Sequence, residues 1–139
     1  MKRALFVLLA AIILFAFCPI SYAENTVPMR GPVSGFDVSL LHHRCIVGGI
    51  TKTSSSTWNR SFTVNVSSLS KPSDTYLRIT LVDHNGNAIG GYKNWSTTGT
   101  KTLTLNSNMV NESSVYLQLR NTAQSGNIVT TGDYTGTYY

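Results

Sequence analysis

The sequence predicts an all-β fold, a small antiparallel β-sandwich or jelly roll of about seven or eight strands. Three observations predict it. From Phe36 onward the helix formers alanine and glutamate occur only at Ala88, Ala123 and Glu112, whereas β-branched residues are abundant. Apolar and polar residues alternate along several short segments, which is typical of strands with one buried face. Turn-forming residues separate those segments.

The first 23 residues precede this domain and are a predicted secretory signal peptide. A basic pair, Lys2 and Arg3, comes before an unbroken apolar run, and small residues stand at Ser21 and Ala23, the positions that a signal peptidase requires. A retained membrane anchor is the alternative, but an anchor needs about 20 apolar residues, and Pro19 interrupts this run. We therefore expect cleavage after Ala23 and a secreted, extracellular mature chain that does not span a membrane.

Removal of 23 of the 139 residues would leave 116, which is enough for one domain. Residues 24–35 contain two prolines and two glycines and are expected to be an irregular lead-in to a single domain, residues 36–139. Loss of Lys2 and Arg3 lowers the formal net charge from +5 to +3. The remaining basic residues form no run along the chain, which argues against a nucleic-acid partner, whereas weak attraction to an anionic surface stays open.

Strands are expected wherever the apolar residues fall on every second position. The clearest segments are 62–66, 76–82, 102–105 and 115–120, and further strands are expected near 36–41, 44–50, 88–93 and 127–138. In segment 76–82, Leu77, Ile79 and Leu81 share one face, which we expect to point into the core. In segment 115–120 the apolar face consists of Val115, Leu117 and Leu119. The pattern indicates half-buried antiparallel strands.

Turn signals lie between these segments. Asn85-Gly86 predicts a type I′ hairpin, because both central residues of that turn need positive φ angles. Residues 67–74 are expected to be a loop, and further turns are expected at 97–99 and 125–127. In the spacing of its strands and turns, rather than in a motif, the stretch from 58 to 139 resembles small bacterial exported β-sandwich domains that are appended to proteases and cell-wall enzymes.

Cys45 would be the only cysteine left after cleavage, because Cys18 lies in the predicted signal peptide. We expect it to be a small buried apolar side chain, and the alternative is an intermolecular disulfide that links a dimer. A third possibility is a cysteine hydrolase, since His43 and Cys45 share one face of a strand. Metal sites need three or four protein ligands, and this segment does not offer them.

Other catalytic patterns are absent from the sequence. The segment 83–87 begins like a calcium loop, but an EF-hand needs glycine and glutamate at positions that Ala88 and Asn94 occupy. Phosphate-binding glycine loops, nucleophile elbows and His-Glu-x-x-His zinc motifs do not occur. The six carboxylates show no pairing suited to glycoside hydrolysis. We therefore expect a protein that is not an enzyme and carries no cofactor or metal.

Aromatic and polar side chains form the strongest candidate for a ligand-binding face. If the leucines and isoleucine of segment 76–82 point inward, its Tyr and Arg side chains point outward, and the same holds for segment 115–120. Flat rings pack on sugar faces while amide and guanidinium groups reach hydroxyls. The alternative is that the rings cover sheet edges or complete the core. The candidate residues are Tyr76, Arg78, Trp95, Tyr116, Gln118 and Arg120.

These observations favour a secreted, non-catalytic module that binds cell-surface or extracellular polysaccharide or protein, for example in a cell wall. A small antibacterial or membrane-active factor is the second hypothesis, because the chain is small and positively charged and contains the apolar segment 40–47. Asn-x-Ser sequons would accept glycans in a eukaryotic secretory pathway. They begin at Asn59, Asn65, Asn94 and Asn111.

Overall fold

A computed structural model describes residues 29–30, 34–41, 44–53, 55–123 and 126–139. The predicted signal peptide, together with His42 and His43, lies outside the described residues. The secondary structure consists of β1 (Met29–Arg30), β2 (Ser34–Leu41), β3 (Arg44–Thr51), β4 (Trp58–Ser70), β5 (Leu77–Val82), β6 (Ala88–Trp95), β7 (Gly99–Thr104), a 3-10 turn η1 (Ser107–Met109), β8 (Ser114–Asn121) and β9 (Asn127–Tyr138). Apart from this turn, the described part of the chain contains no helix, which confirms the all-β prediction.

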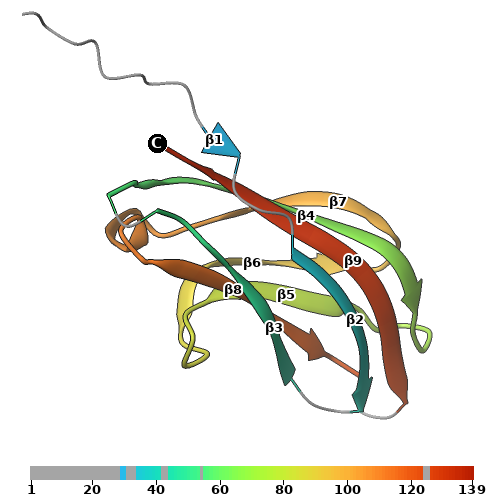
Figure 1. Ribbon diagram of the computed structural model, residues 1–139. Coiled ribbons are helices and arrows are strands. Elements are labelled where there is room, and N and C mark those ends of the chain that lie inside the picture. The colour runs from blue at the N-terminus through green and yellow to red at the C-terminus, as the bar shows by residue number, and fades with distance from the viewer. Residues whose placement is uncertain (1–28, 31–33, 42–43, 54, 124–125) are drawn as a thin grey trace, which may run out of the picture.

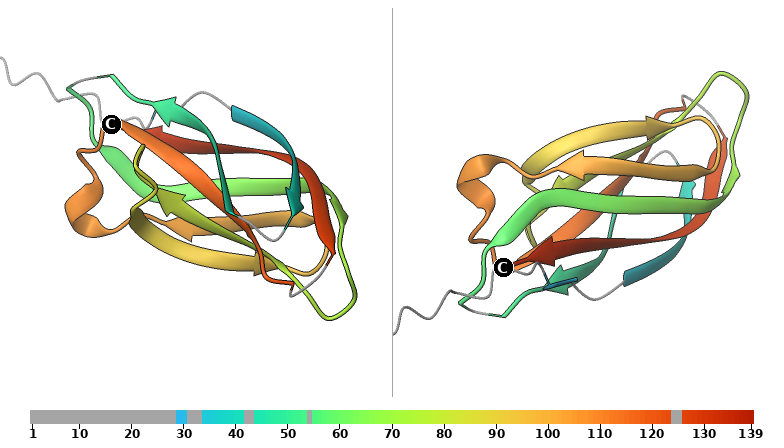
Figure 2. Two further views of the ribbon diagram at one scale, coloured as in Figure 1. Left: turned by 90° about the horizontal axis from the view of Figure 1, so that it is seen from below. Right: turned by 90° about the horizontal axis from the view of Figure 1, so that it is seen from above.

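The strands form two antiparallel sheets that face each other (Figure 1). Sheet A has the order β1-β9-β4-β7, with β2 also paired to β9, and sheet B has the order β3-β8-β5-β6. From β2 to β9, six of the seven links between successive strands cross from one sheet to the other, and only the β5–β6 hairpin stays within its sheet. Figure 2 shows β8 and β5 in front when the molecule is seen from below, and β4 and β9 in front when it is seen from above.

The core lies between the two sheets and follows the predicted alternation. Leu77, Ile79 and Leu81 of β5 are fully buried, and Ile79 and Leu81 pair in register with Leu119 and Leu117 of β8. Full burial of each such side chain contributes about 1.5–3 kcal/mol. Because these residues take the inner positions of β5 and β8, the residues between them must lie on the outer face of sheet B.

The hairpin between β5 and β6 is where the sequence predicted it, but the turn type differs. Asp83 N–H donates to the Asn87 carbonyl at 3.0 Å, and Gly86 N–H donates to the Asp83 carbonyl at 3.1 Å. Gly86 has a φ of +84°, whereas Asn85 does not have a positive φ. The predicted type I′ turn is therefore wrong. The loop is a type I turn followed by a left-handed glycine.

Strand β4 is longer than the sequence indicated. Residues 67–70 were expected in a loop, but they continue β4 after a shift in register between Val66 and Ser68. The Ser68 hydroxyl lies 2.7 Å from that of Thr131, so polar side chains hold the end of β4 against β9. The predicted lead-in also contributes to sheet A, because β1 and the first residues of β2 pair with β9.

Strand β3 is irregular at the point where it crosses β8. Val47 pairs with Leu117 and Ile50 with Val115, so three steps along β3 match two steps along β8. The extra residue is a β-bulge at the two glycines, 48 and 49. A Cβ at Gly49 would lie 2.6 Å from the Tyr116 ring, which therefore packs directly over this bulge.

Candidate ligand-binding face

The outer face of sheet B brings five of the six candidate residues to one side of the molecule. Strand order places β8 between β3 and β5. Arg120 of β8 consequently pairs in register with Arg78 of β5 on one side and with Arg44 of β3 on the other. We call Arg44, Arg120 and Arg78 the arginine row. Adjacent strands lie about 5 Å apart, so the row is a line of cations that crosses three strands.

A second line of outward side chains runs parallel to the arginine row. Gln118 pairs with Ile46 on β3 and with Thr80 on β5, and Thr80 pairs with Tyr92 on β6. Tyr92 is 55% exposed and Ile46 is 41% exposed. The face therefore combines guanidinium, amide and hydroxyl groups with one accessible aromatic ring.

Arg78 is held in place by its neighbours. Its Nε donates to Asn94 Oδ1 at 3.1 Å, and its Nη2 donates to the Tyr76 hydroxyl at 3.2 Å. The guanidinium carbon lies 4.3 Å from the centroid of the Tyr92 ring and 5.6 Å from that of Tyr76. Cation–π contacts at these distances contribute about 0.5–1 kcal/mol at exposed sites. Arg78 therefore forms a preorganised end of the row.

Arg44, at the other end of the row, and Arg120, in its middle, are both exposed. Neither of these guanidinium groups forms an ion pair with a carboxylate among the residues that the structure describes. Like charges directly opposite each other in a sheet destabilise it. Their alignment thus leaves uncompensated positive charge on the face.

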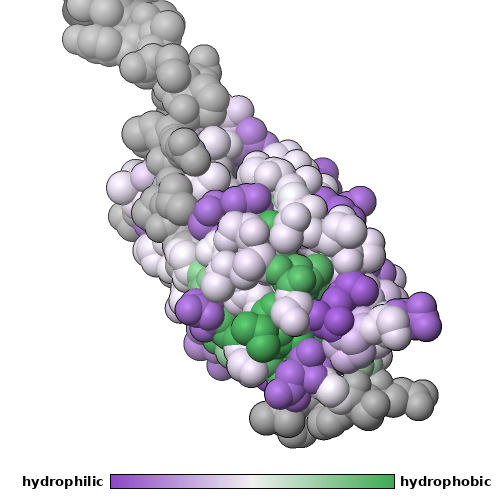
Figure 3. Space-filling model, turned by 90° about the vertical axis from the view of Figure 1, so that its right-hand side faces the viewer, coloured by the Kyte–Doolittle hydropathy of each residue, from purple (hydrophilic) through white to green (hydrophobic). Residues whose placement is uncertain are grey.

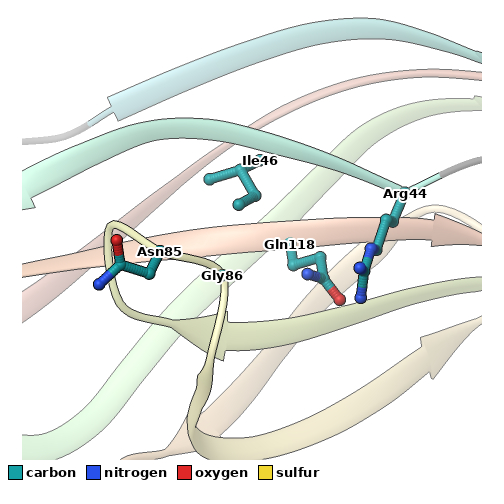
Figure 4. Close-up of a pocket in the computed structure, with 5 residues that line it drawn as sticks. All are labelled: Arg44, Ile46, Asn85, Gly86 and Gln118. Carbon is teal, nitrogen blue, oxygen red and sulfur yellow. The ribbon is translucent and has the colours of Figure 1, made fainter.

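A cavity of about 320 Å³ lies beside the row, between the β5–β6 loop and strands β3 and β8. It is lined by Arg44, Ile46, Asn85, Gly86 and Gln118. Figure 4 shows Arg44 and Gln118 extending from neighbouring strands, with Ile46 between them and the loop that carries Asn85. A Cβ at Gly86 would lie 2.9 Å from Ile46 Cδ1, so the loop packs directly on the end of the Ile46 side chain, and the φ of +84° favours glycine at this position.

Trp95 does not join this face, although the sequence placed it among the candidate residues. Its side chain is 0% exposed and belongs to the core, and its Nε1–H donates to the Gly99 carbonyl at 2.9 Å. Trp95 pairs with the buried Leu77, so it occupies an inner position of β6 despite its polar neighbours. Trp95 is therefore a core residue and not part of the outer face.

Tyr116 lies on the outer face of β8 but is half-buried, because its ring covers the bulge of β3. Tyr92, Arg44 and Ile46, in contrast, belong to the face and were missed by the sequence reasoning. The outward position of Tyr92 could in part have been predicted from the alternation of residues along β6. Tyr92 alternates with the buried Ile89 and Trp95 along β6, but two glycines interrupt the pattern that would have revealed it.

The residues weighed for catalysis or metal binding form no site in the described part of the chain. Cys45 is half-buried on β3, and its thiol donates weakly to the Ile46 carbonyl at 3.7 Å. Its predicted partner His43 lies outside the described residues. No group of three or more His, Cys, Asp or Glu side chains among the described residues is placed to hold a metal ion.

The Asp83 carboxylate, which begins the calcium-like segment, is used to close its own loop. It accepts hydrogen bonds from the backbone of Asn85 and from the backbone and side chain of Asn87, at 2.8–2.9 Å. The side-chain amide of Asn87 is the main cause that holds the pKa of Asp83 below its ordinary value of 3.8. These bonds stabilise the loop that forms one wall of the cavity.

The apolar segment 40–47, which suggested a membrane-active factor, has some side chains in the core and others on the surface. Leu40 and Val47 are buried, whereas Ile46 points outward. On the side of the molecule shown in Figure 3, hydrophobic residues gather in one small area that is surrounded by more polar ones. Within the part that the structure describes, no helix has the length and apolar character needed to cross a membrane.

Comparison with known proteins adds no assignment, because neither a protein-family model nor a curated protein matches the chain.

Proposed function

We propose that the protein is a secreted, non-catalytic binding module, and that the outer face of sheet B binds a polysaccharide or protein at a cell surface or in the extracellular space. The observation that carries the proposal is the convergence of Tyr76, Arg78, Gln118 and Arg120 on one sheet face, beside the exposed ring of Tyr92. Exposed aromatic rings and guanidinium groups are enriched at binding surfaces.

The fold is compatible with this role. From β2 to β9, every link between successive strands except β5–β6 crosses between the two sheets. This pattern supports a jelly roll, which is the architecture that we propose for the protein. Jelly rolls include lectin domains. This support is an analogy at the level of the fold, so the assignment of function depends on the side chains of the face.

Retention on insoluble matrices tests the proposal. Isolated cell walls, cellulose and chitin are incubated with the purified protein, and the bound fraction is measured after sedimentation. Wild-type protein should be retained by at least one matrix, and Tyr92→Ala should reduce retention several-fold. Stacking on an aromatic ring is worth about 0.5–1.5 kcal/mol, which corresponds to roughly two- to tenfold in affinity.

Tyr139→Ala is the matched control. Tyr139 is 50% exposed, close to the value for Tyr92, but it lies at the end of the chain and not on the outer face of sheet B. The control should be retained as well as wild type. Absence of retention on every matrix, or an equal loss for both variants, would contradict the proposed function.

A further inference from the structure

We infer that the ligand of this face is an acidic polysaccharide, whose carboxylate or sulfate groups are bound by the arginine row and whose sugar hydroxyls are bound in the adjoining cavity. This inference rests on the proposed function and specifies its substrate class. The row and the cavity share Arg44, so one ligand that occupies both would contact a continuous surface.

The positive charge of the arginine row favours an acidic ligand. Three guanidinium groups stand in register across β3, β8 and β5, and none forms an ion pair with a carboxylate among the described residues. Guanidinium binds carboxylate, sulfate and phosphate oxygens with two parallel hydrogen bonds. A polymer with negative charges at regular intervals would compensate the repulsion within the row, whereas a neutral glycan would not.

The groups around the row favour a sugar over other polyanions. Gln118 extends its side-chain amide toward Arg44 in the lining of the cavity (Figure 4), and an amide can both donate to and accept from a hydroxyl. Tyr92 offers an exposed ring at the far end of the same face. A membrane surface would call for several exposed apolar side chains, and Ile46 is the one exposed large aliphatic residue on this part of the described face.

Matched pairs of polymers test the inference. Binding of wild-type protein to dextran sulfate is compared with unmodified dextran, and binding to polygalacturonate is compared with its methyl ester. Titration calorimetry gives the affinities at low and at physiological ionic strength. We expect binding to at least one acidic polymer, no measurable binding to its neutral counterpart, and weaker binding as salt screens the charges. The two acidic polymers distinguish sulfate from carboxylate recognition.

Two variants with equal net charge separate the row from a general charge effect. Arg44→Gln with Arg120→Gln removes the two exposed arginines of the row, whose guanidinium groups donate no hydrogen bond within the described structure, so the fold should persist. Lys71→Gln with Lys93→Gln removes two charges from other positions. The first variant should bind about tenfold more weakly than wild type, as for the loss of two exposed charge pairs. The second should bind like wild type, and thermal unfolding confirms that both are folded.

Four results would contradict the inference, and they differ in whether the proposed function is also lost. An equal loss of affinity in both variants would overturn the inference, because net charge alone would then explain binding. Retention on cellulose or chitin without preference for an acidic polymer would overturn the inference but leave the proposed function standing. Equally tight binding to phosphatidylglycerol vesicles or to duplex DNA would overturn the choice of a polysaccharide. Absence of binding to every polymer and matrix would remove both.

Discussion

Tyr92 and Trp95 are three positions apart on β6 and therefore lie on opposite faces of sheet B. Trp95 fills the core and uses its indole N–H to bond the Gly99 carbonyl, while Lys101 lies over its ring at 5.3 Å. Tyr92 is exposed and packs against the Arg78 guanidinium. β6 thus supplies one aromatic residue that stabilises the core and a second one that is exposed on the surface.

Substitution of each aromatic residue should separate these roles. Trp95→Ala removes a large, fully buried side chain and should lower the free energy of unfolding by about 3–5 kcal/mol. Tyr92→Ala loses an exposed cation–π contact and should cost no more than about 1 kcal/mol. Urea unfolding followed by circular dichroism measures both. Similar losses for the two variants would contradict the assignment of the two faces.

At the level of single residues, the sequence predicted the core of β5 and β8 well, because Leu77, Ile79 and Leu81 leave no ambiguity about which face is apolar. Trp95 was misplaced for a physical reason. Its neighbours Asn94 and Ser96 are polar, and Gly90 and Gly91 have no side chain that could report which face is buried. Trp95 faces the core because it pairs with the buried Leu77 of β5. Which residue it pairs with is set by the tertiary structure and could not be predicted from β6 alone.

The β5–β6 hairpin is the element that connects stability with the candidate site. Its loop is closed by bonds to the Asp83 carboxylate, and the same loop covers one side of the cavity. The side-chain amide of Asn87 makes the largest contribution to the lowered pKa of Asp83, followed by the backbone N–H of Asn87, and burial acts in the opposite direction. Deprotonated Asp83 therefore stabilises the folded loop.

The sign of the pH effect follows from this lowered pKa. A carboxylate with a folded pKa below its unfolded value contributes stability above the unfolded pKa, and that contribution is lost as pH falls through the folded pKa. The loop should thus weaken below pH 3.8. Asn87→Ala should raise the pKa of Asp83 toward 3.8, as measured by NMR titration of its carboxyl carbon. His84→Ala is the control with a smaller expected rise, since His84 contributes least. A larger rise in the control would refute this account.

Elements were predictable where local chemistry determines them. Asn85-Gly86 located the hairpin, but the loop is one residue longer than a type I′ turn because Asp83 bonds to both Asn85 and Asn87. The end of β4 could not be predicted from its serines. Those side chains favour turns in isolation, and here they are held in a strand by Thr131 of β9, a residue far away in the sequence.

The two outer faces of the whole molecule differ in charge and chemistry. Sheet B presents the arginine row, whereas the outer positions of sheet A carry Asp37 and Asp133 together with threonine and serine hydroxyls. Asn65 donates to Asp133 at 3.4 Å and accepts from Thr100 at 3.3 Å, so this face is internally bonded. Asp37 and Asp133 thus lie on the opposite side of the molecule from the arginine row.

Charge repulsion within the arginine row should be measurable as a stability cost. Arg120 has a like charge on both neighbouring strands, so Arg120→Gln should raise the free energy of unfolding by a few tenths of a kcal/mol at low ionic strength. The gain should shrink as salt screens the repulsion. Lys93→Gln, which removes an exposed charge outside the row, should show no such gain. Thermal unfolding at two salt concentrations measures these differences, and a loss of stability in Arg120→Gln that persists at high salt would argue against repulsion.

The arrangement of the candidate face could not be predicted from the sequence alone. Alternation along β5 and β8 places Arg78 and Arg120 on outer positions, but it does not say that the two strands are neighbours. The contribution of Arg44 depends on β3 pairing with β8, across about seventy residues of chain. Pairing between such distant segments is a property of the topology, and the face exists only through it.

The first and last described strands pair in sheet A, and this pairing makes a circular permutation of the chain possible. Met29 pairs with Tyr138, and the backbones of Thr57 and Tyr139 exchange two hydrogen bonds of 2.9 Å, so the first described strand lies beside the last (Figure 1). A short glycine-rich bridge could join these segments, and the chain could be opened between the exposed Ser73 and Asp74 instead. Such a circular permutant would retain every strand pairing of both sheets, and it would move the attachment point for a label or a solid support to a different loop.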